Sequence, residues 1–413
     1  MTTSDDEMRE TVETFLSYRS LPGAEEPAQR WLLDELSDRG FETYEWQPDR
    51  DVLAAHPSFP PLETLELDDR PSVAGVLELG DPDDGPTVVL NGHADVVPVE
   101  EASWSRDAFD PWWDGDRLYG RGALDMKSGL VACVFAALSV AERTDDLDGR
   151  IVVESVVGEE EGGVGAASAA GANPYPFDRD AAIIAEPTGL DLVVASEGSL
   201  MKRLTLYGRS AHAANRWEGE SVLPHFERVR QAFRSLERER AERVRHPLYE
   251  AYDNPWPVNF GTVNAGSWHS SVPAELTSEL RIGVAPQETV REVEAQFEAR
   301  LADVVAADDW LSAHPPDFER FSVQFEGSEV DRSEPIVEAV AGAVRERGTS
   351  PTYEGLTGGT DARHYLEAGI PTVVFGPGSS GTAHQPDEYV TWSEVVEGKR
   401  LLADAVAGLL GGD

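Results

Sequence analysis

Cysteine is almost absent from this 413-residue sequence, which contains only Cys133. A single cysteine excludes an intrachain disulfide and a metal cluster held by several thiolates. Cys133 lies in an apolar stretch, residues 129–138, that predicts a helix, and we interpret it as a small buried side chain. No apolar run reaches the roughly 20 residues of a membrane span. The acidic N-terminus lacks the basic and apolar segments of a secretory signal, so we expect a cytoplasmic protein without membrane contact.

Basic residues are scarce as well. Lysine and arginine number 34, of which only Lys127, Lys202 and Lys399 are lysines, whereas aspartate and glutamate number 77, and the net charge is -43. Nucleic-acid binding is disfavoured, because phosphate contacts need clustered basic side chains. The acidic residues are spread over the whole chain. They indicate either binding of a polycation or, as we favour, a halophilic surface whose repulsion is screened within roughly 3 Å at about 1 M salt.

The length and the pattern of apolar residues predict two domains. Before residue 198 and after residue 329, strand-like runs alternate with helical runs, which is typical of an α/β sheet covered by helices. The predicted strands are 72–79, 87–91, 150–157, 181–185 and 372–375, and the predicted helices are 11–18, 25–39, 127–143, a segment from 164, 335–347, 362–368 and 391–410. Residues 49–70 are rich in proline and aspartate and predict a loop.

A second pattern begins near Glu197. It predicts strands at 200–207, 258–263, 275–284 and 318–327, with helices at 221–245 and 289–306. This β-α-β-β-α-β order is that of a ferredoxin-like domain. We therefore predict a discontinuous α/β domain, residues 1–197 and 330–413, that carries an inserted α+β domain, residues 198–329.

Candidate metal ligands follow several predicted strands. His93 and Asp95 come after strand 87–91, and Glu186 comes directly after strand 181–185. Open α/β sheets bind ligands at the carboxyl ends of their strands. Histidine is the commonest metal ligand, and a carboxylate or carbonyl normally fixes its second ring nitrogen. Asp95 could do so for His93, although the His-x-Asp spacing alone is a weak signal.

Further carboxylates lie at turns. A lone aspartate at Asp125, before helix 127–143, would be expected to cap that helix, but a two-metal site needs a carboxylate that bridges ions roughly 3.5–4 Å apart. Glu159 and Glu160 follow strand 150–157 and precede two glycines, where the backbone must turn sharply. One such carboxylate can bind metal while its neighbour takes a proton from the attacking water. With His384 in a glycine-rich loop, these residues predict a two-metal hydrolase.

Seven motifs, in this order, resemble the acetylornithine deacetylase/succinyl-diaminopimelate desuccinylase family, which is related to aminoacylases and glutamate carboxypeptidases. The motifs are residues 92–95 (GHAD), 120–127 (GRGALDMK), 159–160 (EE), 186–188 (EPT), 208–212 (GRSAH), 358–363 (GGTDAR) and 383–384 (AH). They span nearly the whole chain. The resemblance implies a zinc-peptidase fold, with a mixed sheet covered by helices and an inserted lid through which a homodimer forms.

The resemblance also implies roles for individual residues. It implies two zinc ions per subunit, which cobalt can replace, held by five residues: His93 and Glu186 on one ion, Glu160 and His384 on the other, and Asp125 between them. Glu159 would be the general base and acid, and Asp95 would orient His93. His212 would reach from the lid of one subunit to the site of the other and stabilise the developing oxyanion. The peptide bond between Asp125 and Met126 would be cis.

Substrate binding transfers less directly than metal binding. Many relatives carry an asparagine shortly before the lid proline, and this chain does not. Arg281 follows Pro273 by eight residues, slightly fewer than in better-known members, and is expected to bind a substrate carboxylate. Gly358, Gly359 and Thr360 are expected to contact the substrate as well.

The predicted activity is hydrolysis of the amide bond of an N-acyl amino acid or a related N-acyl amine. A dipeptidase or carboxypeptidase would use the same chemistry. Residues 308–316 resemble a broader deacylase subgroup that includes an aminopyrimidine deformylase. A binding protein that has lost catalysis is disfavoured, because the complete set of candidate ligands and Glu159 is present. The sequence does not identify the acyl group or the amine.

Overall fold

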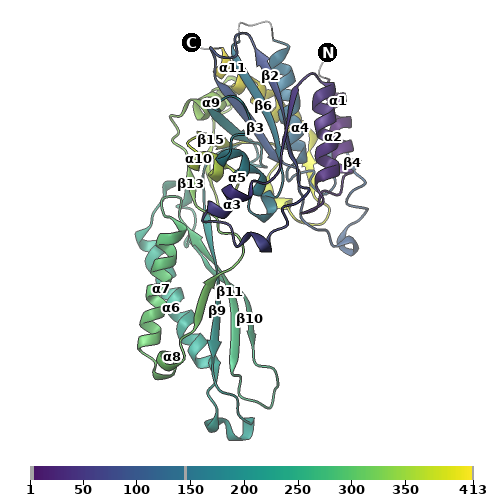
Figure 1. Cartoon of the computed structure of the whole chain (residues 1–413). Helices are drawn as coiled ribbons and strands as arrows, with labels where there is room; N and C mark the ends of the chain where they lie inside the picture. Colours follow the sequence, from purple (N-terminus) through teal and green to yellow (C-terminus); the bar gives the residue numbers. More distant parts are fainter. Residues whose placement is uncertain (1–3, 144–146, 412–413) are drawn as a thin grey trace.

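The computed structural model describes residues 4–143 and 147–411. A nine-stranded sheet with its helices forms one part of the molecule, and a four-stranded sheet with two long helices extends away from it (Figure 1). The predicted fold class, a mixed sheet covered by helices together with a separate α+β domain, is confirmed. Among the described residues, no helix is both long and apolar enough to cross a membrane.

The large sheet has the order β1-β2-β6-β3-β7-β15-β8-β13, and β14 pairs with β8. Its neighbours β6, β3, β7 and β15 run parallel, so their carboxyl ends lie at the same edge of the sheet. The strands are β1 (Glu42–Trp46), β2 (Ser72–Leu79), β3 (Thr87–His93), β6 (Gly149–Val156), β7 (Ala181–Ile184), β8 (Leu192–Ser196), β13 (Ser328–Glu329), β14 (Tyr353–Leu356) and β15 (Thr372–Val374). A small separate sheet contains β4 (Trp112–Asp114), β5 (Arg117–Tyr119) and β16 (Tyr389–Thr391).

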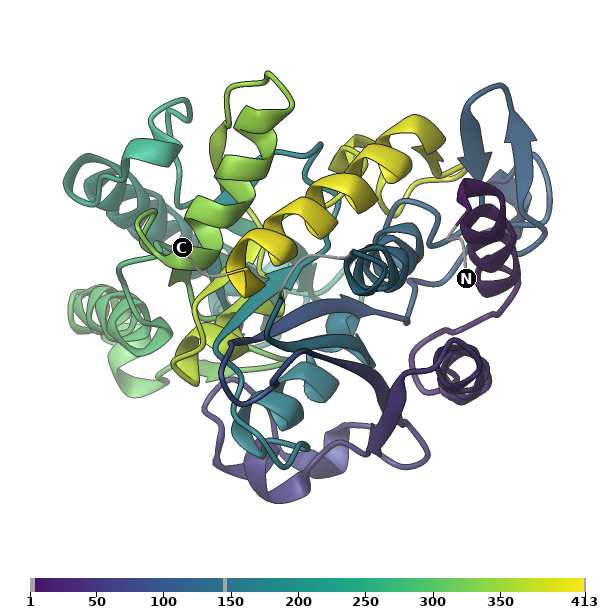
Figure 2. The same ribbon diagram turned by 90° about the horizontal axis from the view of Figure 1, so that it is seen from above.

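Helices cover both faces of the large sheet (Figure 2). One layer contains α1 (Asp5–Leu16), α2 (Glu26–Asp38), α4 (Lys127–Ala141), α9 (Pro335–Glu346) and α11 (Trp392–Leu410), and the other contains α3 (Arg50–Ala55), α5 (Val164–Gly171) and α10 (Ala362–Glu367). Successive side chains of a strand point to opposite faces, so the side chains of the central strand β3 pack against both helix layers. Val88 and Leu90 belong to the core cluster on the α4 side, and Val89 belongs to the cluster on the α5 side.

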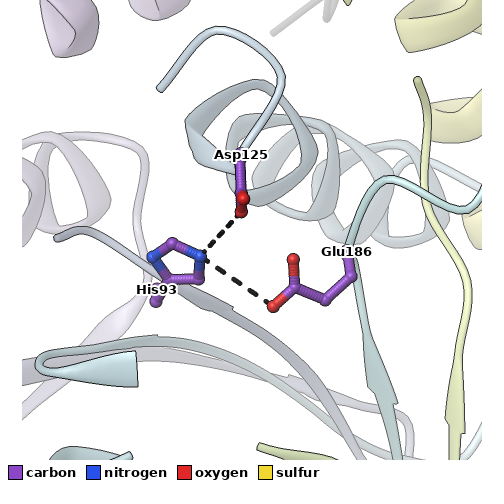
Figure 3. A group of neighbouring side chains, drawn as sticks. All are labelled: His93, Asp125 and Glu186. Atoms are coloured by element: carbon purple, nitrogen blue, oxygen red, sulfur yellow. Dashed lines mark hydrogen bonds and ion pairs between the residues drawn. The ribbon is translucent and has the colours of Figure 1, made fainter. Parts of the chain in front are cut away.

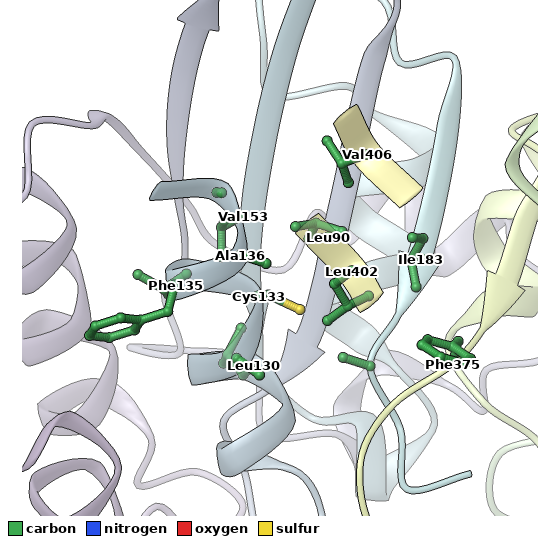
Figure 4. Packing of buried hydrophobic residues seen from close by; sticks show 14 of the residues in the cluster. Leu90, Leu130, Cys133, Phe135, Ala136, Val153, Ile183, Phe375, Leu402 and Val406 are labelled. Atoms are coloured by element: carbon green, nitrogen blue, oxygen red, sulfur yellow. The ribbon is translucent and has the colours of Figure 1, made fainter. Parts of the chain in front are cut away.

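The only cysteine lies in the larger of these cores. Cys133 on α4 is fully buried together with Leu90 of β3 and Leu402 of α11 (Figure 4). Burial raises the pKa of the Cys133 thiol, so that it stays protonated. The prediction of a small buried side chain is confirmed.

The four-stranded sheet, with its helices, is called the insert below. Its order is β10-β11-β9-β12 with antiparallel neighbours, so the elements follow the predicted ferredoxin-like β-α-β-β-α-β order. Its elements are β9 (Gly198–Tyr207), α6 (Val222–Arg243), β10 (Val258–Ala265), β11 (Glu275–Val284), α7 (Val290–Ala306), α8 (Asp309–Ala313) and β12 (Asp317–Arg320). The predicted domain limits, residues 198 and 329, remain a proposal, and Ser328 and Glu329 pair with β8 of the large sheet.

Two sequence predictions about local structure are wrong. Residues 318–327 do not form one strand, because β12 ends at Arg320 and Ser322 has a left-handed φ of 58°, and the segment beyond it pairs with β9 through an isolated bridge between Phe325 and Ser199. The loop predicted at 49–70 contains helix α3. Its N-cap is Asp49, whose carboxylate accepts hydrogen bonds from the next amides, so an aspartate that suggested a turn begins a helix instead.

Candidate active site

Three adjacent parallel strands bring the candidate ligands to one edge of the sheet. His93 is the last residue of β3, Glu186 follows β7, and Glu160 follows β6. Glycines with left-handed backbone angles surround the turn after β6: Gly158, Gly162 and Gly163. Glycine adopts such angles without a steric penalty, so the chain can reverse there and direct the glutamates back toward β3. The predicted sharp turn is confirmed.

The imidazole ring of His93 is held in one orientation by a main-chain carbonyl. Its Nδ1 donates a hydrogen bond of 2.8 Å to the main-chain carbonyl of Asp95. Its Nε2 lies 3.1 Å from Asp125 Oδ1 and 3.9 Å from Glu186 Oε1 (Figure 3). Because Nδ1 keeps its proton in the hydrogen bond to the carbonyl, a metal ion would displace the proton on Nε2, and the tautomer that remains is the one that binds a metal ion.

Asp95 contributes differently from the sequence interpretation. Its carboxylate oxygen lies 3.6 Å from His93 Nδ1, beyond hydrogen-bond distance, so the main-chain carbonyl orients the ring. The carboxylate instead accepts hydrogen bonds from the amides of Glu159 and Glu160, at 3.3 and 3.0 Å. Asp95 thus fixes both the imidazole and the turn that carries the glutamates.

Asp125 joins a second group of donor atoms to the first. His384 Nε2 lies 3.2 Å from Asp125 Oδ2 and 3.1 Å from Glu160 Oε1. The two carboxylate oxygens of Asp125 therefore face different histidines. Helix α4 has Met126 at its N-cap position and no side-chain cap, so the alternative role of Asp125 as a helix cap is wrong. The bond between Asp125 and Met126 is cis, as expected.

The two groups fit metal ions. His93, Asp125 and Glu186 place one donor atom each within 4.8 Å of one another, and Asp125, Glu160 and His384 do the same. Zinc binds imidazole nitrogen and carboxylate oxygen at about 2.0–2.2 Å, so ligand atoms around one ion are about 3–4 Å apart. The nitrogen–oxygen separations of 3.1–3.9 Å agree with that spacing.

The electrostatics of the site favour bound cations. Burial, with nearby carboxylates, raises the pKa of Glu159 and of Glu186 well above the usual range. Burial would also raise the pKa of Asp125, but hydrogen bonds from His384 and His93 lower it. Hydrogen bonds to Asp125 and then Glu160 raise the pKa of His384 to about 10. Because like charges destabilise one another in a buried site, divalent cations would stabilise the ionised cluster.

A buried ion pair beneath Asp125 was not predicted from the sequence. Glu388 is fully buried and accepts hydrogen bonds from the amides of Leu124 and Asp125, at 2.9 and 3.2 Å. Arg121 donates to Glu388 and, at 3.5 Å, to the carbonyl of His384. The pair therefore connects the loops that carry Asp125 and His384. The glycine-flanked position of Arg121 was a signal in the sequence, but Glu388 offered none.

Asp361, in the GGTDAR motif, is a second unpredicted neighbour of the site. It is buried, and among the described residues neither of its carboxylate oxygens has a hydrogen-bond partner. Burial raises the pKa of Asp361 to about 7, and its charge contributes to the raised pKa of Glu159.

A cavity of about 440 Å³ opens beside the two ligand groups. Every predicted metal ligand except His93, together with Glu159, contributes to its wall, and so do all four predicted substrate-binding residues: Arg281, Gly358, Gly359 and Thr360. Sequence reasoning missed Ser199 and Met201 on β9, Leu356 on β14 and Phe325, which complete the opposite wall. These residues follow the ordinary strand pattern and gave no functional signal.

His212 does not lie at this cavity. It is exposed and pairs with Ser271, and it follows the end of β9 that is remote from Ser199. Residues 198–207 rise about 3.3 Å each, so the far end of β9 at Tyr207, which His212 follows by five residues, lies about 30 Å from Gly198. Its Nδ1 accepts a hydrogen bond of 3.1 Å from the amide of Ala214. A neutral imidazole in this position carries its proton on Nε2, which is then available as a donor.

Comparison with known proteins defines the family. Residues 89–408 match the model of peptidase family M20/M25/M40, and the chain belongs to this family of metal-dependent, typically zinc-dependent, hydrolases. The resemblance to acetylornithine deacetylases and succinyl-diaminopimelate desuccinylases is confirmed.

Individual relatives differ in substrate. The N-formyl-4-amino-5-aminomethyl-2-methylpyrimidine deformylase of Bacillus subtilis is 26% identical, over 97% of this chain and 94% of its own. Acetylornithine deacetylase of Edwardsiella ictaluri is 28% identical, over 77% of this chain and 79% of its own. Among solved structures, an M20 family metallo-carboxypeptidase from Sulfolobus solfataricus has a TM-score of 0.76 at 17% identity, covering 98% of this chain and 99% of its own. A tripeptidase from Staphylococcus aureus has a TM-score of 0.74 at 21% identity, covering 99% and 98%.

Proposed function

We propose that the protein is a two-zinc amidohydrolase that releases the acyl group from an N-acyl amino acid. The observation that carries this proposal is the shared position of Asp125, whose two oxygens face His93 and His384 in two overlapping ligand groups. In this proposal His93 and Glu186 would hold one ion, Glu160 and His384 would hold the other, and Asp125 would be a ligand shared by both. Cobalt would fit the same donors. When bound, the ions lower the pKa of a water molecule and polarise the scissile carbonyl.

Glu159 is the proposed proton carrier. It lines the cavity next to the ligand Glu160, and its buried position raises its pKa. A carboxylate in such a position accepts a proton from the attacking water and then donates it to the leaving amine. Asp95 supports both steps, because it holds His93 and the amide of Glu159.

The position of Arg281 supports the proposal that the substrate carries a carboxylate. Among the described residues that line the cavity, it is the only lysine or arginine. Arginine binds carboxylates with two parallel hydrogen bonds. This favours an N-acyl amino acid over a neutral substrate. A dipeptide or a peptide with a free C-terminus satisfies the same requirement, so a peptidase remains the second candidate, and the coverage of the deformylase relative makes an N-formyl aminopyrimidine the third.

We further propose a homodimer formed through the insert. Strand β10 is an edge strand of the insert sheet, and most of its residues are exposed. Val263 on β10 and Trp268 just beyond it are 48% and 64% exposed. An exposed edge with apolar side chains pairs readily with another edge, and a second copy of the chain would cover it. In such a dimer His212 would reach the cavity of the partner subunit, where its Nε2 proton would stabilise the developing oxyanion.

A substrate panel tests the proposed activity. Purified protein loaded with zinc or cobalt is assayed in molar KCl with N-acetyl, N-succinyl and N-formyl amino acids, with dipeptides, and with an N-formyl aminopyrimidine. Turnover of N-acyl amino acids above the other classes is the expected result. The control is Glu159→Ala, which should retain bound metal and lose about 10²–10⁴-fold in kcat, the contribution of a general base. Failure to hydrolyse any N-acyl amino acid would refute the proposal, and a Glu159→Ala rate above a tenth of wild type would refute the role of Glu159.

A further inference from the structure

Glu197 occupies the point where the chain passes from the large sheet into the insert. It lies between the end of β8 at Ser196 and the start of β9 at Gly198. Its side chain is 1% exposed, and its amide donates a hydrogen bond of 2.8 Å to the carbonyl of Leu356 on β14. Leu356 and Ser199 both line the cavity. Glu197 is therefore a buried carboxylate directly behind the cavity wall.

The partner of this carboxylate is Arg281. Arg281 Nη1 donates a hydrogen bond of 3.0 Å to Glu197 Oε1, and Nη2 lies 3.4 Å from the carbonyl oxygen of Thr357. Arg281 belongs to β11 of the insert, whereas Thr357 follows β14 of the large sheet. The guanidinium is thus held on one side by the junction residue and on another by the large domain. Its side chain is 30% exposed and lines the cavity.

The neighbouring backbone leaves space for this arrangement. A Cβ atom at Gly283 would lie 2.4 Å from Glu197 Oε1, so any other residue at that position of β11 would displace the carboxylate. Gly283 pairs with Ser199 and Arg281 pairs with Met201 in the register between β11 and β9. The cavity wall formed by Ser199, Met201 and Arg281 is therefore built around the buried carboxylate.

We infer that Glu197 is a positioning residue that fixes the Arg281 guanidinium for recognition of a substrate carboxylate. This inference rests on the proposed function for the identity of the substrate. Arginine has a long side chain with considerable rotational freedom, and two of its donors must be aligned to bind a carboxylate. The chain contains 77 acidic residues with which a free arginine could pair. The contacts of Nη1 with Glu197 and of Nη2 with Thr357 remove this freedom before the substrate arrives, which reduces the entropy lost on binding.

Positioning and charge compensation make opposite predictions. If Glu197 only offset the charge of Arg281, its removal would strengthen binding of an anionic substrate. If Glu197 positions Arg281, Glu197→Ala should weaken that binding, whereas Glu197→Gln, which keeps an acceptor oxygen, should restore most of it. The comparison of the two variants therefore separates the roles.

The experiment measures KM and kcat for an N-acetyl amino acid and for the same compound with its carboxylate replaced by a carboxamide. Assays are done well above pH 7, because burial raises the pKa of Glu197 to about 7. Glu197→Ala should raise KM for the carboxylate about tenfold with kcat within about threefold, leave KM for the carboxamide unchanged, and add little to Arg281→Ala in the double variant. Glu197→Gln should stay within about threefold of wild type.

The matched control is Glu237, another buried carboxylate of the insert, whose partner Arg234 is half exposed and does not line the cavity. Glu237→Ala should leave both KM values unchanged. Equal changes for both substrates, no change, or a lower KM in both Glu197 variants would overturn the inference. Calorimetric binding of the same two compounds to a metal-loaded Glu159→Gln protein separates this from the proposed function. If wild type hydrolyses neither compound but the carboxylate binds in a Glu197-dependent manner, the proposed activity fails and the positioning role stands.

Discussion

Glu388 accepts a hydrogen bond of 3.2 Å from the peptide N–H of Asp125. Side chains that hold metal ligands in this way affect metal affinity by about 10–100-fold. Glu388→Ala should therefore weaken zinc or cobalt binding by about that factor, because Asp125 faces both ligand groups. Calorimetric titration of metal, together with the metal content of the purified protein, measures the effect.

A control for Glu388 is needed because loss of one partner of a buried ion pair destabilises a protein. Glu288 forms a comparable pair in the insert with the fully buried Arg240, and neither residue lines the cavity. Glu288→Ala should lower the melting temperature and leave metal affinity unchanged. If the Glu388→Ala protein does not fold, Glu388→Gln, which keeps the acceptor for both amides, should bind metal more tightly than Arg121→Met. A folded Glu388→Ala protein with wild-type metal affinity would contradict the prediction.

His212 should act on the active site of the partner subunit. His212→Ala and Glu159→Ala proteins should each be nearly inactive, and an equimolar mixture refolded together should regain part of the wild-type rate, because a hybrid dimer has one site with an intact Glu159 and an intact partner His212. The loss in His212→Ala alone should be about 10²–10³-fold in kcat, as for other oxyanion donors. Hybrids that form, as seen by differently tagged subunits, but stay inactive would show that His212 does not work across the dimer.

The melting temperature should rise with salt concentration. At a net charge of -43, carboxylates repel one another over about 10 Å at 0.1 M salt but over only about 3 Å at 1 M. Thermal unfolding monitored from dilute to molar KCl should show a steady increase in the midpoint. A neutral osmolyte, which does not screen charge, provides the comparison. A midpoint independent of KCl would mean that the acidic surface is not an adaptation to salt.

Glu197 should make the protein less stable as the pH rises from about 4.5 to about 7. Burial raises its pKa from 4.5 in the unfolded chain to about 7 in the folded protein. Between these values the unfolded chain binds fewer protons, so the free energy of unfolding falls with increasing pH. The melting temperature of wild type should therefore fall relative to that of Glu197→Gln as the pH rises through this interval. Above the interval the difference between the two proteins should stay constant. A difference that does not vary with pH would contradict the raised pKa.

The candidate metal ligands could be identified from the sequence because each lies where a buried strand or a glycine-rich turn ends in a polar residue. His93 and Glu186 follow apolar runs of β3 and β7, and such runs are recognisable from composition alone. Arg281, Gly358 and Thr360 were expected from family motifs, and the fold brings them to the same cavity. In these cases the neighbouring sequence is enough to show that the residue follows a strand or lies in a known motif.

The residues that sequence reasoning missed depend on contacts between distant segments. Glu388 and Asp125, which form a hydrogen bond, are 263 residues apart in the sequence, and Glu197 and Arg281 are 84 residues apart. Acidic residues are abundant in this chain, and neither glutamate interrupts an apolar pattern. Only their burial in the folded protein distinguishes them from the other acidic residues. The strand predicted at 318–327 was wrong for a related reason. The left-handed backbone at Ser322 interrupts the pairing with β9, which returns as an isolated bridge at Phe325, and hydrophobic periodicity does not register such an interruption.

The cavity has two walls of different origin. All the candidate metal ligands come from the large sheet and its loops, whereas Ser199, Met201 and Arg281 come from strands of the insert. Under the proposed function, substitutions in β9 and β11 would alter which substrate is selected without disturbing the proposed hydrolytic groups. Relatives with the same ligand pattern could then diverge in substrate through the insert alone, so exchange of insert strands between family members is a direct route to new substrate specificity.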